Sequence, residues 1–206
     1  MFPYVERRTK KMTDSFDQLK QDCSQCMRCS LGNTRHHLVF GVGNEHAPIV
    51  FIGEGPGEKE DLQGVPFVGP AGHLLDMMLQ LIGLDRTKVY ICNIVKCRPP
   101  LNRDPSPEER DACSEWLQRQ IALIDPKILV CLGRISATTL IDSAFRITRD
   151  HGKWYERDGR QIIATFHPSA LLRDPSKRPE AFSDFREIRA ALRTLQPDYL
   201  ERNILL

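Results

Sequence analysis

The chain has 206 residues, of which 41% are hydrophobic and 27% are charged, and its formal net charge is +2. This composition is typical of a globular protein with one sizeable core, and the length is short for two domains. No apolar stretch approaches the roughly 18 residues of a membrane span, and the N-terminus lacks the apolar stretch of a signal peptide. We therefore expect a cytoplasmic protein that does not span a membrane.

The small net charge does not decide whether the chain binds nucleic acid. A DNA-binding protein of this balance must gather its positive charge on one face. Two clusters of basic residues are candidates: residues 7–11, and Arg173 with Lys177 and Arg178. Each cluster could equally be solvated surface charge.

Apolar runs alternate with helical patterns along the chain. Four runs predict short strands buried on both faces, at residues 49–52, 89–95, 128–132 and 162–165. Helices are predicted at residues 72–82, 106–124, 134–141 and 179–195. This alternation predicts a parallel sheet covered by helices on both faces, which is a three-layer α/β/α domain.

Two of the predicted helices carry specific signals. The first places five apolar side chains on one face: Leu74, Leu75, Met78, Leu79 and Ile82. The second opens with a capping box, in which Ser106 is the N-cap, Pro107 is the first helical residue and Glu109 follows the cap by three residues.

Polar motifs follow or end the predicted strands. Residues 53–58 follow the first strand, Asn93 lies near the end of the second, and His167 follows the last. In open α/β sheets the carboxyl ends of the strands form the ligand crevice. The sequence therefore predicts that Glu54, Asn93 and His167 meet at one edge of the sheet.

The glycine-rich segment GEGPGEKEDLQGVPFVGPAG, residues 53–72, fits neither common phosphate-binding motif. Lys59 is followed by Glu60 and Asp61 instead of Ser or Thr, and the glycine spacing is not that of a dinucleotide-binding loop. The acidic residues would also repel phosphate. Backbone amides exposed by glycine suit a neutral, planar ligand, and a plain surface turn is the alternative.

Seven cysteines in a chain without a secretion signal favour thiols or metal ligands over a disulfide framework. Residues 23–29, CSQCMRC, contain two overlapping C-x-x-C pairs: Cys23/Cys26 and Cys26/Cys29. With Cys97 and Cys113, such a pair supplies four ligands for zinc or an iron–sulfur cluster, and spacing does not choose between the two. Cys113 could instead pack in the core beside Trp116. The others lie inside predicted strands and are interpreted as core residues: Cys92 and Cys131.

Taken together, the motifs resemble one known family. The segments GEGPGEKED, GVPFVGPAGHLL, VYICNIVKCRPPLNRDPSPEE and FHPSALLR resemble, in order and spacing, the family 4 uracil-DNA glycosylases, the iron–sulfur branch of that superfamily. The resemblance covers about residues 23–195. It implies a glycosylase domain over residues 23–195 with a central four-stranded parallel sheet, a lead-in of residues 1–22 and a tail of residues 196–206.

The same resemblance implies a function. Such enzymes flip uracil out of DNA and hydrolyse its N-glycosidic bond, which leaves an abasic site for base excision repair. The expected partner is uracil-containing DNA, single- or double-stranded, and the expected state is a monomer. No lysine occurs at the pocket motifs, so we expect hydrolysis without strand cleavage.

Matching residues imply the site. The implied ligands of a [4Fe–4S] cluster are Cys26, Cys29, Cys97 and Cys113, with Cys23 spare. The implied uracil-binding residues are Glu54, Gly55, Glu60, Phe67, Asn93 and His167. Phe67 would stack on the base, Asn93 would pair with its edge, and His167 would donate toward the pyrimidine O2.

The resemblance also bears on which residues activate water and which contact DNA. Better-known uracil glycosylases carry Asp-Pro-Tyr where this chain has Gly55-Pro56-Gly57. Glu54 is therefore the expected water-activating residue, with Glu60 in reserve, and the implied catalytic residues are Glu54, Asn93 and His167. Leu171 resembles the leucine that superfamily members insert into DNA and is therefore expected to be exposed, whereas Leu172 is expected to pack inward. The alternative is that both leucines pack inward. Arg173 would hold a flanking phosphate.

Two other functions are compatible with parts of this pattern. One is a non-catalytic DNA-binding or redox module that keeps the fold and the cluster. The other is a metal-dependent nucleotide hydrolase that uses the acidic loop. The combined set Glu54, Phe67, Asn93 and His167 favours the glycosylase, because a binding module does not need that charge-stabilising set.

Overall fold

The computed structural model describes residues 15–201 and centres on a six-stranded sheet, in the order β1-β3-β2-β4-β6-β5. The four central strands are parallel: β2 Ile49–Gly53, β3 Tyr90–Asn93, β4 Ile128–Leu132 and β6 Arg160–Thr165. The two edge strands are antiparallel: β1 Val42–Gly43 and β5 Trp154–Arg157. The predicted four-stranded parallel sheet is confirmed, and the edge strands extend it.

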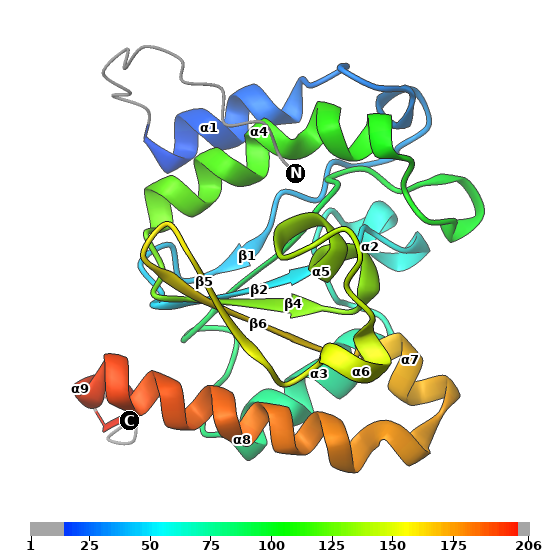
Figure 1. Cartoon of the computed structure of the whole chain (residues 1–206). Helices are drawn as coiled ribbons and strands as arrows, with labels where there is room; N and C mark the ends of the chain where they lie inside the picture. The colour runs from blue at the N-terminus through cyan, green and yellow to red at the C-terminus, as the bar shows by residue number, and fades with distance from the viewer. Residues whose placement is uncertain (1–14, 202–206) are drawn as a thin grey trace.

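Helices cover both faces of the sheet (Figure 1). One face packs against α1 Phe16–Ser24, α4 Pro107–Ile124 and α5 Arg134–Leu140. The other packs against α3 Pro70–Leu81, α7 Pro168–Arg173 and α8 Arg178–Leu195. The remaining short elements are η1 Ser30–Asn33, α2 Glu58–Gln63, η2 Pro100–Asn102, α6 Ile147–Asp150, η3 Pro175–Lys177 and α9 Pro197–Glu201. The predicted three-layer α/β/α class is confirmed.

The strands are buried on both faces because their side chains alternate between two cores. In β2, Val50 and Ile52 belong to the core beneath α1 and α4, whereas Ile49 and Phe51 belong to the core beneath α3 and α8. The five apolar residues predicted to share one face of the helix over residues 72–82 are all buried, which confirms that helix and its face.

The segment that opens α4 is built as the sequence predicts. Ser106 Oγ accepts the Glu109 amide at 3.3 Å, and Glu109 Oε2 accepts the Ser106 amide at 2.8 Å, which completes the capping box. Glu109 also holds Arg103 through two bonds of 2.8 and 2.7 Å. These contacts fix the end of the loop between β3 and α4.

Regular structure extends past both predicted boundaries of the glycosylase domain, residues 23 and 195. Helix α1 begins at Phe16 and buries Leu19, so regular structure starts before the predicted domain boundary at residue 23. At the other end, α9 lies within the predicted tail of residues 196–206, and its Tyr199 donates to the Lys88 carbonyl at 2.8 Å, which holds this part of the tail against the domain. The basic cluster of residues 7–11 lies outside the described residues, and no helix within residues 15–201 is long and apolar enough to cross a membrane.

The expectation that Leu171 is an exposed apolar tip is wrong. Its side chain is 1% exposed and belongs to the core beneath α3 and α8. The reason is the phase of α7, which begins at Pro168 and turns Leu171 toward α3, while Leu172 is 40% exposed. Leu172, one residue further, therefore lies on the solvent side.

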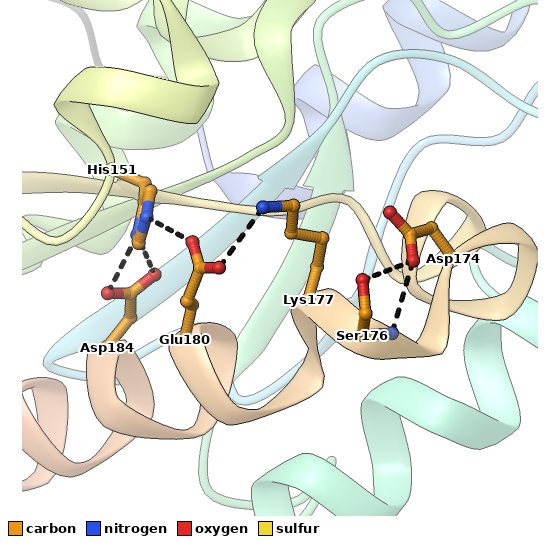
Figure 2. A network of polar contacts seen from close by, with 6 residues as sticks. All are labelled: His151, Asp174, Ser176, Lys177, Glu180 and Asp184. Carbon is orange, nitrogen blue, oxygen red and sulfur yellow. Dashed lines mark hydrogen bonds and ion pairs between the residues drawn. The ribbon is translucent and has the colours of Figure 1, made fainter.

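A polar network ties the carboxyl end of β6 to α8 (Figure 2). His151 lies between two carboxylates, with Nδ1 2.9 Å from Asp184 and Nε2 3.1 Å from Glu180. Lys177 donates to the other oxygen of Glu180 at 3.1 Å. Thr165 donates to Asp184 at 2.6 Å. Because Thr165 is two residues before His167, this network anchors the strand end that presents the histidine.

Candidate active site

The carboxyl ends of β2, β3 and β6 bring the predicted pocket residues together. Gly53 pairs in register with Asn93, and a Cβ on Gly53 would lie 2.4 Å from Asn93 Oδ1 and 2.7 Å from Cζ of Phe67. The Phe67 and His167 rings stack with centroids 5.6 Å apart and planes 30° apart. Gly53 therefore has to be glycine for this group to form.

Asn93 carries an unsatisfied acceptor. The residue is 2% exposed, and its Oδ1 has no hydrogen-bond partner within the described part of the chain. Its backbone carbonyl accepts the Lys96 ammonium at 2.9 Å, so the main chain is fixed while the amide oxygen is available. A buried acceptor without a partner is costly, by about 1–3 kcal/mol, unless a ligand donates to it. Asn93 Oδ1 is thus poised for an N–H group.

His167 is held as a neutral hydrogen-bond donor. The Ser169 amide donates to Nδ1 at 3.1 Å, so Nδ1 is an acceptor and the ring proton is assigned to Nε2. Burial, assisted by the nearby positive charge of Arg173, lowers the pKa of His167 to about 4, although Glu60 opposes this. At neutral pH the imidazole can therefore donate through Nε2–H without carrying charge.

Glu54 titrates near neutrality. Burial, together with the like charge of hydrogen-bonded Asp104, raises the pKa of Glu54 to about 7, while Arg134 and Arg110 act in the opposite direction. Asp104 forms an ion pair with Arg134. Asp104 was not predicted as a site residue, because no local pattern reveals that its loop folds back onto Glu54.

Glu60 and Gly55 have structural contacts in this structure. Oε1 of Glu60 accepts the amides of Val68 and Gly69, both at 2.9 Å. A Cβ on Gly55 would lie 2.8 Å from Cγ2 of Val95. Glu60 thus holds the turn that follows Phe67 through Oε1. Because Glu60 has this structural contact, Glu54 is the better candidate for a general base.

Phe67 has a strained backbone that other residues enforce. Its φ of 55° lies in the left-handed region, which is costly for an aromatic residue. Arg86 donates to the carbonyls of Pro66, at 3.0 Å, and of Phe67, and is itself held by Asp76 at 2.7 Å. Gly72 leaves room for this turn, because a Cβ at that position would lie 1.7 Å from the Phe67 carbonyl oxygen. Arg86 was not predicted, and only its position after a helix end could have drawn attention to it.

Five cysteines surround one hollow between η1, the end of β3 and α4: Cys23, Cys26, Cys29, Cys97 and Cys113. Three N–H groups point at sulfur: Trp116 Nε1 at Cys26 (3.2 Å), Arg35 Nη1 at Cys97 (3.2 Å) and the Lys96 amide at Cys113 (3.3 Å). The ammonium of buried Lys96 lies nearby. Donors and cations of this kind stabilise thiolates bound to metal.

The thiols themselves are not arranged as a finished metal site. Among residues 15–201, no group of three or more His, Cys, Asp or Glu side chains stands ready to hold a metal ion. Burial raises the pKa of Cys113 to about 11, and it raises that of Cys97 against the effect of Arg35. Cys23, fully buried on α1, has a pKa raised to about 12 by burial. The shared hollow and the donors directed at sulfur nonetheless fit a group bound by thiolates.

Comparisons with known proteins agree with this geometry. The model of the uracil DNA glycosylase superfamily matches residues 40–193. A type-4 uracil-DNA glycosylase of Archaeoglobus fulgidus is 48% identical over 91% of this chain and 100% of its own length. A type-4 enzyme of Thermotoga maritima is 47% identical over 74% and 80%, and a type-5 enzyme of Thermus thermophilus is 32% identical over 64% and 68%.

An α/β sheet that gathers an unpaired amide, an aromatic ring and a neutral histidine at its strand ends is the architecture of a base-recognising enzyme. The chain belongs to the uracil DNA glycosylase superfamily, and within it to the type-4 uracil-DNA glycosylases. The two cores, the parallel sheet and the cysteine hollow are therefore features of a type-4 member.

Proposed function

We propose that this protein flips uracil out of DNA and hydrolyses its N-glycosidic bond, leaving an abasic site for base excision repair. The observation that carries the proposal is the buried, unpaired Oδ1 of Asn93 beside the Phe67 ring and the neutral His167. A flipped pyrimidine read at its Watson–Crick edge needs these groups.

Each group has a distinct role in the proposed reaction. Phe67 stacks on the base, and Asn93 accepts from uracil N3–H and donates to O4, an arrangement that the edge of cytosine opposes. As the bond to the sugar breaks, negative charge accumulates on the uracil O2. His167 donates Nε2–H to that oxygen, which lowers the barrier electrostatically. Ionised Glu54 orients and deprotonates the water that attacks the sugar.

Lysine chemistry does not fit this pocket. Lys59 is exposed, and the ammonium of buried Lys96 is engaged, because it donates to the Asn93 carbonyl at 2.9 Å. We therefore propose a monofunctional glycosylase without strand cleavage. Exposed Arg173 is proposed to contact a flanking phosphate.

The test is incubation with a uracil-containing oligonucleotide in EDTA, followed by alkali. We expect cleavage at the uracil position only after alkali, because the glycosylase leaves an abasic site. Activity in EDTA would exclude a metal-dependent nucleotide hydrolase. No cleavage of either single or double strands would support a non-catalytic module and overturn the proposal.

We also propose that the cysteine hollow holds a [4Fe–4S] cluster through Cys26, Cys29, Cys97 and Cys113. These four residues would hold the cluster between the segment after α1, the end of β3 and α4, and its role there would be chiefly structural. The support is the set of N–H donors directed at three of these sulfurs. None of the seven cysteines, all within residues 15–201, forms a disulfide, which suits a reducing compartment, and we propose a cytoplasmic monomer.

Cys113→Ser is expected to lower iron content and solubility, whereas Cys23→Ser should leave iron content unchanged. Anaerobically purified protein should be brown with about four irons per chain. The measurement is iron and zinc per chain together with the visible spectrum. Colourless protein with one zinc would contradict the cluster, and equal losses in both variants would show that Cys23 is also a ligand.

Arg86→Lys is expected to lower uracil excision by roughly tenfold, because lysine cannot make the forked bonds that hold the left-handed turn at Phe67. The loss should appear mainly in KM, since Phe67 binds the base, while Tm changes little. Arg189→Lys, an exposed arginine of α8, is the control. Unchanged KM with unchanged kcat would show that the turn holds without Arg86.

A further inference from the structure

Leu101 is an apolar side chain displayed to solvent beside the candidate pocket. It is 95% exposed, more than any other large hydrophobic residue in the part of the chain that the structure describes. It lies in η2, on the loop of residues 98–106 between β3 and α4. A single exposed leucine is ordinary on a protein surface. Its backbone and its surroundings are what make this one unusual.

The tip of the loop is strained and braced. Leu101 and Asn102 have φ values of 53° and 54°, so two consecutive residues other than glycine are left-handed. Arg98 donates to the Asn102 side chain at 2.8 Å, and the Asn102 amide donates to the Pro99 carbonyl at 3.0 Å. These contacts therefore hold the loop in a strained backbone conformation that presents Leu101 outward in one orientation.

The base of the loop touches the proposed catalytic machinery. A Cβ on Gly55 would lie 3.6 Å from Pro99, and Asp104 is hydrogen-bonded to Glu54. Figure 1 shows the loop, in green before α4, projecting past the end at which β2, β4 and β6 finish, the same end that carries α7. Leu101 and the exposed Leu172 thus belong to two segments that flank the pocket.

Partly exposed guanidinium groups at the base of the loop, each paired with a carboxylate, favour a nucleic acid as the group that Leu101 meets. Three arginine side chains are partly exposed there: Arg98 at 22%, Arg103 at 46% and Arg134 at 54%. Each is oriented by a carboxylate, which fixes its position without covering it. An apolar tip above cations matches a DNA strand, which offers base faces beside phosphates.

We propose that Leu101 packs against the base stack of duplex DNA next to the extruded uridine, as an apolar contact separate from the segment after His167. The inference rests on the proposed function and extends it to a second DNA-contacting element. Extrusion breaks stacking and pairing, and an apolar side chain in the stack offsets part of that cost. The contact is therefore needed on duplexes and dispensable on single strands.

The test compares kcat/KM on double- and single-stranded uracil oligonucleotides for the wild type, Leu101→Ala and Leu81→Ala. Leu81 is 61% exposed at the far end of α3, roughly 16 Å along that helix from its first residue, and is the matched control. We expect Leu101→Ala to lose roughly tenfold on duplex DNA, the scale of one buried leucine contact, and little on single strands. Tm should not change, and Leu81→Ala should behave as the wild type.

A second measurement follows the base stack directly. A duplex with 2-aminopurine next to an abasic-site analogue should gain fluorescence on binding the wild type and gain less on binding Leu101→Ala. Equal loss on both substrates, or no loss on either, would overturn the proposal. Concentration-dependent association that Leu101→Ala abolishes would assign the tip to a second copy instead. Absence of wild-type activity on every uracil substrate would refute the proposed function and leave the fluorescence test to decide the contact.

Discussion

Asn93→Asp is expected to lower the rate of uracil excision by about 10² or more, the scale of one lost oriented donor in a buried site. Asp keeps the shape of Asn, but its carboxylate only accepts hydrogen bonds, so the partner of uracil O4 is lost. The measurement is single-turnover excision from a uracil oligonucleotide.

The control for Asn93→Asp is Asn102→Asp, an exposed amide on the loop before α4, and both variants are compared on single-stranded DNA, where the proposed Leu101 contact is dispensable. It tests whether a new carboxylate near the site is enough to slow the reaction. Tm of both variants separates loss of folding from loss of chemistry. An unchanged rate in folded Asn93→Asp would show that Asn93 does not read the base.

For Glu54 we expect a pH dependence as well as a loss. The carboxylate is the active form of a general base, and its pKa is about 7, so kcat/KM should rise with pH through about 7 and then level off. The pKa of His167, near 4, keeps the imidazole neutral over this range. Glu54→Gln should lose about 10² or more and lose the rise.

Asp104→Asn isolates the cause of that pH dependence. Removing the like charge and its hydrogen bond should lower the pKa of Glu54, so the rise in kcat/KM should move to lower pH. Burial still raises the pKa, so the shift should be partial. Glu156→Gln, on the edge strand β5, is the control and should leave the profile unchanged. A profile that Asp104→Asn does not move would show that the titrating group is another residue.

The sheet and its polar edge could be predicted because their signals are local. Each of the four central strands contains a short apolar run, and the capping box at Ser106 needs only four residues. Edge strand β1, with two residues, is too short to give a period-2 pattern. Strand β5 has a mixed pattern of partly buried and exposed residues.

The parts of the site that were not predicted depend on contacts between distant segments. Arg86 contacts Phe67, which lies 19 positions earlier in the chain. Asp104, on the loop between β3 and α4, contacts Glu54, which directly follows β2. Nothing in the local sequence of either residue indicates these contacts. The exposure of Leu171 was predicted wrongly because one residue of helical phase decides which of two adjacent leucines enters the core.

The two antiparallel edge strands also govern how the protein behaves in crowded solution. Four largely apolar strands side by side, with both edges of the sheet open, would be a template for adding strands from other chains, and so for aggregation. Here β1 closes one side with only two residues, and β5 closes the other with charged Glu156 and Arg157. Arg157 is held by the Leu140 carbonyl at 2.9 Å. Edge strands this short or this charged offer little for a strand of a neighbouring chain to pair with. The two edge strands therefore protect the protein against aggregation through its sheet.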